Sequence, residues 1–269
     1  MTTYAAGEPR SPASSGSPSL PSRRLLVVEL LIVLSLSLGR SAVYSVVSLI
    51  AAATEPGGLA AQTTTLNGTY TPERPLLDLT YQLLGIVFAL APVALAGYLL
   101  VRTGSVLRDV WFKGAGWRDV PTGALIAAGV GSVGLLFYLG MHALGLNLTV
   151  AASGLDTSPW WNVPVLVLQA VKNAVLEEFV VLGYVLVRLR QLGFSDIRAI
   201  GLAALLRGSY HLYQGLGGFV GNLVMGLLFG WLYRRWGRVT PLVVTHTLLD
   251  VGAFVGYAAL AGHVSWLPT

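Results

Sequence analysis

Long apolar segments alternate with short polar ones along the chain, and this pattern predicts its architecture. The apolar runs cover about residues 25–53, 76–101, 121–146, 162–187, 197–214, 219–233 and 239–261. A helix needs roughly 20 predominantly apolar residues to cross the hydrocarbon core of a bilayer, and helices satisfy their own backbone groups there. We therefore expect an all-α, polytopic membrane protein with about seven transmembrane helices.

The polar segments divide the chain into regions. Residues 1–24 are rich in Ser, Pro, Ala and Gly, which predicts a disordered N-terminal tail. Residues 25–159 are expected to form N-terminal transmembrane helices, 160–262 a second membrane domain, and 263–269 a short C-terminal tail. The first apolar run is too long for a cleaved signal peptide, which favours a retained signal-anchor helix.

Basic residues predict the orientation of these helices. They lie before the first span and after the second, fourth and sixth, whereas the loops on the other side contain only Arg74. Because cytoplasmic loops carry the excess of Lys and Arg, we expect a multi-pass protein of the cell membrane with a cytoplasmic N-terminus. Trp111 and Trp117 in the loop 102–120 are expected to act as interfacial anchors.

Composition supports the same class and excludes others. Hydrophobic residues make up 54% of the chain and charged residues only 11%, against roughly 25% charged residues in soluble domains. The net charge of +5 lies at the ends of apolar segments, so we expect the lipid bilayer and not nucleic acid as a partner. The absence of cysteine excludes disulfides and thiolate chemistry.

Small residues at helical spacing predict close contacts between helices. Gly123, Ala127 and Gly131 lie in the third span. The pairs Gly217/Gly221 and Gly226/Gly230 have the GxxxG spacing that allows the backbones of two helices to approach each other.

Two adjacent carboxylates, Glu177 and Glu178, lie inside the fourth apolar run. A charge at the centre of a membrane helix costs roughly 2.5–3.5 kcal/mol on insertion scales, so such residues usually have a function. Gln169, Asn173 and Glu177 recur every four residues and form one polar stripe. Glu178 is turned about 100° away from this stripe.

Two later spans also carry polar pairs at i, i+4. Arg207 and His211 lie in the fifth span, and His246 and Asp250 in the seventh. Counted at about 1.5 Å per residue from the basic ends, these residues and Glu177 lie near the middle of a core about 30 Å thick. A lone histidine is more often a packing residue, but acids and histidines on three helices favour one shared functional site.

Three motifs run through these helices in order. Glu177 and Glu178 match a Glu-Glu-x-x-x-Arg run, with Leu182 at the arginine position. His211 matches the second motif, Phe-x-x-x-His, with Arg207 at the phenylalanine position.

His246 and Asp250 match the third motif, His-x-x-x-Asn/Asp, completely. Over about residues 160–262 the chain therefore resembles the CPBP family of intramembrane proteases, which includes the type II CAAX prenyl endopeptidases and bacterial Abi-type proteins. The two departures suggest an exchange, in which Arg207 reaches Glu178 from the neighbouring helix in place of an arginine at 182.

The resemblance implies an intramembrane endopeptidase that hydrolyses a peptide bond of a peptide or membrane-protein substrate. Glu177 would be the general base and His211 would hold or share the proton of the attacking water. His246 would donate to the oxyanion and Asp250 would orient His246. The supporting residues would be Glu178, Arg207 and Asn173.

Two alternatives stay open. No cofactor is expected, but Glu177, His211 and His246 are also an adequate ligand set for zinc. The chain could instead be a non-enzymatic membrane protein, either a proton-coupled transporter or an immunity or scaffold protein, with a buried polar network.

Overall fold

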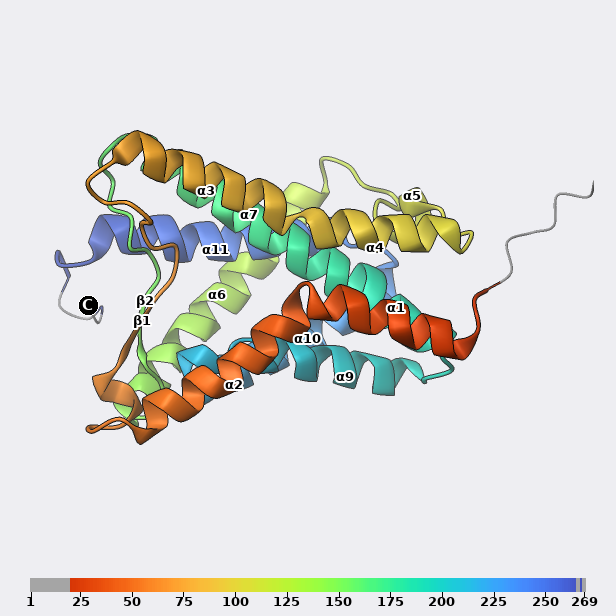
Figure 1. Ribbon diagram of the computed structural model, residues 1–269, viewed down its shortest axis with the longest axis horizontal. Helices are drawn as coiled ribbons and strands as arrows, with labels where there is room; N and C mark the ends of the chain where they lie inside the picture. Colours follow the sequence, from red (N-terminus) through yellow and green to blue (C-terminus); the bar gives the residue numbers. More distant parts are fainter. Residues whose placement is uncertain (1–19, 265–266, 268–269) are drawn as a thin grey trace, which may run out of the picture.

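The computed structural model describes residues 20–264 and 267 and shows an all-α protein (Figure 1). Most of the predicted N-terminal tail, residues 1–24, lies outside the described residues, as does part of the C-terminal tail. The end of the predicted tail is helical, because Arg23 and Arg24 form the start of the first helix.

Apart from the short α5, which lies in the predicted loop 102–120, the helices follow the predicted apolar segments. They are α1 (Arg23–Ser35), α2 (Leu38–Thr54), α3 (Pro75–Ala89), α4 (Ala91–Arg102), α5 (Leu107–Val110), α6 (Asp119–Ala143), α7 (Asn162–Val180), α8 (Val187–Gln191), α9 (Asp196–Ser209), α10 (Leu216–Trp236) and α11 (Thr240–Leu260). Short 3-10 turns are η1 (Leu59–Ala61) and η3 (Leu212–Gln214), and η2 (Val181–Leu186) is a π-helical segment. Two parallel strands pair, β1 (Thr63–Thr65) and β2 (Thr149–Ala151).

The structure supports a polytopic protein but does not confirm seven spans. In the described part of the chain, four helical segments are long and apolar enough to cross a membrane: Pro75–Arg102, Asp119–Ala143, Leu216–Trp236 and Thr240–Leu260. The pair α1 and α2 could form a fifth, although it is bent by 55°. The helices α7 and α9 are not among them, since α7 carries Lys172, Glu177 and Glu178 and α9 has only 14 residues.

Several predicted spans are interrupted or end early. The first breaks between α1 and α2, where the Ser37 hydroxyl donates to the Val33 carbonyl at 2.6 Å. The fourth passes through the π-helical segment η2 between α7 and α8. The fifth ends at Ser209, so His211 lies in the turn after α9 and not inside a helix that continues to Gln214.

Small residues pack helices together as the spacing predicts. A Cβ added to Gly226 would lie 2.9 Å from Ala204 on α9, and one added to Gly230 would lie 2.8 Å from Ile200. Gly123 on α6 is in similarly close contact with Val244 on α11. These contacts fix α9 against α10 and α6 against α11.

The prediction that Trp111 is an interfacial anchor is wrong. Trp117 is exposed, but Trp111 is buried and is not an interfacial anchor. Its indole N–H donates to the Gly183 carbonyl in η2 at 3.2 Å, and its ring packs 4.8 Å from that of Phe179. Trp111 belongs to the larger hydrophobic core, which also includes Leu182, Phe229 and Leu242.

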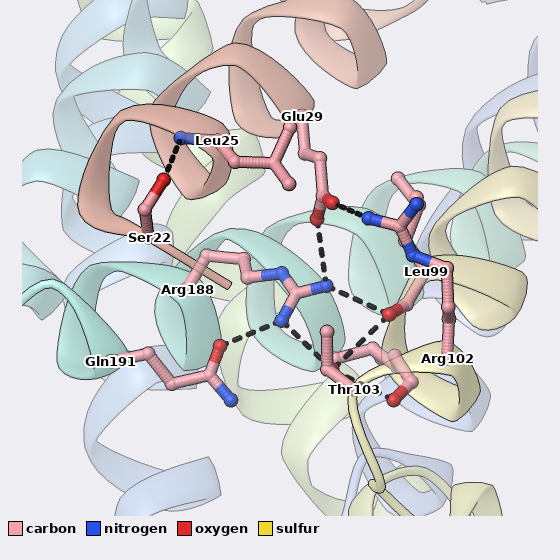
Figure 2. A network of polar contacts seen from close by, with 9 residues as sticks. Ser22, Leu25, Glu29, Leu99, Arg102, Thr103, Arg188 and Gln191 are labelled. Carbon is pink, nitrogen blue, oxygen red and sulfur yellow. Dashed lines mark hydrogen bonds and ion pairs between the residues drawn. The ribbon is translucent and has the colours of Figure 1, made fainter. Parts of the chain in front are cut away.

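A buried polar cluster (Figure 2) lies between α1, α4 and α8, at the end of the molecule where α5 lies (Figure 1). The completely buried Arg188 on α8 donates to a Glu29 carboxylate oxygen at 3.1 Å and to the Leu99 carbonyl at 2.9 Å. Arg102 pairs with the other oxygen of Glu29, and Thr103 and Gln191 accept from Arg188 at 3.1 and 2.7 Å. This cluster joins α1, α4 and α8.

The strands β1 and β2 lie at the opposite end (Figure 1). Asn147, just before β2, is buried, and its side-chain oxygen accepts from the backbone N–H groups of Gly217 and Gly218 at 2.8 and 3.3 Å. It thereby satisfies two of the unpaired donors at the start of α10.

Candidate functional site

Glu178 on α7 is the centre of a buried polar cluster, and its own side chain and that of Arg207 are 0% exposed. One of its oxygens, Oε1, lies 2.7 Å from Arg207 Nη1 and 2.7 Å from His246 Nδ1. The guanidinium also lies over the Phe229 ring, 5.2 Å from its centroid. The contact confirms the expectation that Arg207 reaches Glu178 from the neighbouring helix.

Glu177 has different surroundings from its neighbour. Its Oε2 accepts a hydrogen bond from the Tyr210 hydroxyl at 2.7 Å and lies 3.5 Å from Arg207 Nη2. The Glu177 side chain is 12% exposed, whereas that of Glu178 is 0% exposed. The helical phase thus separates the two acids as predicted, but both contact Arg207, since the guanidinium fork can serve two carboxylates.

His246 lies between two carboxylates. Its Nδ1 faces Glu178, and its Nε2 lies 3.6 Å from Asp250 Oδ1 one turn later on α11. The Asn173 amide donates to Asp250 Oδ2 at 3.1 Å. Asn173 therefore links the polar stripe of α7 to the third motif.

Gln169, the first residue of the stripe, points to another helix. Its amide donates to the Gln82 side chain on α3 at 3.0 Å. The three stripe residues thus have partners on three different parts of the fold, α3, α11 and the turn after α9. Only Asn173 and Glu177 belong to the site.

His211 lies in the turn after α9, beside Tyr210. Its Nδ1 is 3.0 Å from the Arg207 carbonyl. Because a carbonyl oxygen can only accept, the proton of the neutral ring lies on Nδ1 and the lone pair on Nε2. His211 can therefore accept a proton at Nε2.

A cavity of about 810 Å³ adjoins these residues. Its walls include Glu177, His211, His246 and Asp250, the residues that the sequence predicts to be catalytic. Asn173 and Tyr210 also line the cavity, whereas Glu178 and Arg207 do not. The two glutamates thus divide into one that faces the cavity and one that is enclosed behind it.

Two residues near the site are not predicted from the sequence. The Tyr210 hydroxyl donates a hydrogen bond to Glu177. The position of Tyr210 beside His211 in the sequence does not indicate this contact. Lys172 lines the cavity one turn before Leu176, and its charge inside an apolar segment is a signal that could have found it. Across the cavity, the Ser45 hydroxyl of α2 donates to the Tyr210 carbonyl at 2.9 Å.

The residues named for zinc do not form a ready set of ligands. Within residues 20–264, no group of three or more His, Cys, Asp or Glu side chains is arranged to hold a metal ion. His246 Nδ1 already faces Glu178, and the Arg207 guanidinium lies 3.5 Å from Glu177. A fixed cation beside a proposed ligand opposes the binding of a second cation.

Comparison with known proteins supports the family that the motifs indicate. No curated protein and no solved structure matches the chain. Residues 159–252 match the family model described as Type II CAAX prenyl endopeptidase Rce1-like. This range contains all three motifs, from Glu177 to Asp250. Residues 159–252 therefore match the CPBP family of intramembrane proteases that the motifs indicate.

Proposed function

We propose that the chain is an intramembrane endopeptidase of the CAAX-protease/Abi type, which hydrolyses a peptide bond inside the membrane domain. One observation carries this proposal. Within the family-matched segment, Glu177, His211, His246 and Asp250 all line the same cavity. Carboxylates and histidines with access to one space are the groups that peptide hydrolysis with an activated water requires.

Glu177 is the general base in this proposal. The Tyr210 hydroxyl holds one of its oxygens in place at 2.7 Å, and the side chain keeps access to the cavity. The Nε2 lone pair of His211 provides a second acceptor for the proton of the water. A positioned general base contributes typically 10²–10⁴-fold to a rate.

His246 donates to the oxyanion through Nε2. In the imidazolium form both nitrogens donate, with Nδ1 bonded to Glu178 and Nε2 available to the substrate. The contacts favour Glu178 as the residue that orients His246, because it lies at 2.7 Å and Asp250 at 3.6 Å. Asp250, which accepts a hydrogen bond from Asn173, then compensates the positive charge of the His246 imidazolium on the cavity side.

The reaction balances with these groups alone. The water oxygen attacks the carbonyl carbon as its proton passes to Glu177 or His211, and the carbonyl oxygen gains negative charge beside His246. The carbon–nitrogen bond then breaks as the stored proton passes to the leaving amine. No step requires a metal ion or a cofactor.

The test is cleavage of a peptide library by the protein purified in detergent. Glu177→Gln and His246→Ala are expected to lose cleavage, and His263→Ala, an exposed histidine outside the site, to retain it. Strong chelators are expected to leave the activity of the wild type unchanged. Equal cleavage by the wild type, Glu177→Gln and His246→Ala would contradict the assignment.

A further inference from the structure

The cavity extends from the site toward one end of the molecule only. Beyond Glu177 and His211 it is lined by Gln62, Thr63 and Thr64 of the β1 segment and by Gln214 of η3. No residue from 102–118, 188–198 or 234–239 lines it. The space therefore lies between the site and the strands β1 and β2.

The other end of the molecule is filled by side chains. Below the site, Trp111, Leu182 and Phe229 belong to the larger buried core. The cluster of Glu29, Arg102 and Arg188 closes the gap between α1, α4 and α8 further along (Figure 2). Among the described residues, the packed core separates the cavity from that end.

The filled end is the basic end. Helix termini and loops there carry most of the arginines that follow the second, fourth and sixth apolar runs: Arg102, Arg108, Arg188, Arg190, Arg198, Arg234, Arg235 and Arg238. Because cytoplasmic loops carry the excess of basic residues, this end is expected to face the cytoplasm. The cavity would then open away from the cytoplasm.

The lining of the cavity combines apolar side chains with a group of hydroxyl and charged side chains. Ser41, Ser45 and Ser48 recur every three or four residues on α2 and form one wall. Thr63 and Thr64 line the cavity at the β1 end, and Lys172 and Glu55 add one positive and one negative charge. The hydroxyl groups and the ammonium group provide hydrogen-bond partners for a hydrated peptide backbone.

We propose that the site is reached from the extracytoplasmic side and that its substrate is a hydrophilic, extended segment of a peptide or protein exposed there. The substrate part of this proposal rests on the proposed endopeptidase function. The direction of access rests separately on the cavity, the packed core and the basic residues.

Cysteine labelling tests the direction of access. The chain contains no cysteine, so each introduced thiol is the only one present. Thr64→Cys and Ser48→Cys place a thiol in the cavity wall, and Val106→Cys is a matched control in the exposed loop at the basic end. A membrane-impermeant maleimide is added to intact cells and then to permeabilised cells.

We expect Thr64→Cys and Ser48→Cys to react in intact cells and Val106→Cys to react only after permeabilisation. The reverse pattern, or no reaction of either cavity thiol in intact cells, would overturn the proposal. The labelling needs no enzymatic activity, so it gives its answer even if the protein cleaves nothing.

A second measurement separates failure of access from failure of catalysis. Reporter peptides with the same sequence are anchored on the outer or the inner side of the membrane, with the wild type or Glu177→Gln. Cleavage of the outer reporter alone, by the wild type alone, supports both proposals. Cleavage of only the inner reporter overturns the direction of access, and cavity thiols labelled from outside without any cleavage overturn only the protease assignment.

Discussion

Arg207 Nη1 lies 2.7 Å from Glu178 Oε1, and neither side chain is exposed. The arginine that the family motif places one turn after the second glutamate thus comes from a neighbouring helix. Leu182, at the motif position, lies in the hydrophobic core and is 1% exposed. The charge of Glu178 is compensated across the interface between α7 and α9, so this pair joins the two helices.

Arg207→Leu is expected to destabilise the protein strongly. It leaves the Glu178 carboxylate buried without its cation, and breaking a buried pair costs roughly 3–5 kcal/mol. The measurement is thermal unfolding in detergent. Arg198→Leu is the matched control, because Arg198 lies on the same helix but is exposed, and it should change the stability by less than about 0.5 kcal/mol.

The double variant Arg207→Leu with Leu182→Arg is expected to recover part of the lost stability. Position 182 is one turn from Glu178, so an arginine there can reach the same carboxylate. If the double variant unfolds at the same temperature as Arg207→Leu, an arginine at position 182 does not replace Arg207 as the partner of Glu178.

The two glutamates are expected to respond differently to the same substitution. Glu177→Gln removes the proposed base, so kcat should fall by about 10² or more while the unfolding temperature changes little. The new amide oxygen can still accept from Tyr210. Glu178→Gln should instead lower the unfolding temperature, since it removes the charge that faces Arg207 and His246. Peptide cleavage and thermal unfolding of both variants check this, and the opposite assignment of the two effects would exclude Glu177 as the base.

Tyr210→Phe is expected to lower kcat with little change in KM. The hydroxyl donates to Glu177 at 2.7 Å, and a hydrogen bond to a charged group contributes roughly 1.5–3 kcal/mol, or about 10–100-fold in rate if all of it is lost in the transition state. Tyr213→Phe is the control, because its hydroxyl bonds to Gln214 in the wall of the same cavity. Equal kinetics of the two variants would show that the contact with Glu177 does not position the base.

Gly183→Ala is expected to destabilise the π-helical segment. A Cβ at this position would overlap the Trp111 indole, and overpacking a core costs typically 1–3 kcal/mol. Gly129→Ala on α6 is the control, since an added Cβ there meets no atom within 4 Å and alanine favours the helix. An equal effect of the two substitutions on thermal unfolding would contradict the role of Gly183.

Patterns within single helices carry the predictable part of the site. A period of 3.6 residues places Gln169, Asn173 and Glu177 on one face and Glu178 on another, and the structure keeps this separation. The same period pairs His246 with Asp250. Position 182 has no arginine, whereas position 207 has one, and this difference predicted a contact between Arg207 and Glu178. The structure contains that contact.

Contacts between helices carry the part that the sequence alone leaves open. Tyr210 bonds to Glu177 because α9 ends at Ser209 and the following turn places its side chain beside α7. Trp111 lies in a segment whose sequence predicts a membrane-interface loop. Its ring packs in the core because Gly183 has no side chain to fill that space.

The sequence by itself determined the membrane class, the helical segments and the motifs, because apolar length and helical period are properties of neighbouring residues. Only the tertiary structure decided that Glu178 holds His246, that Glu177 faces a cavity, and that this cavity lies toward β1 and away from the basic end. The physical reason is that these features depend on which side chains fill the space between helices. That filling is fixed by packing among segments far apart in the chain.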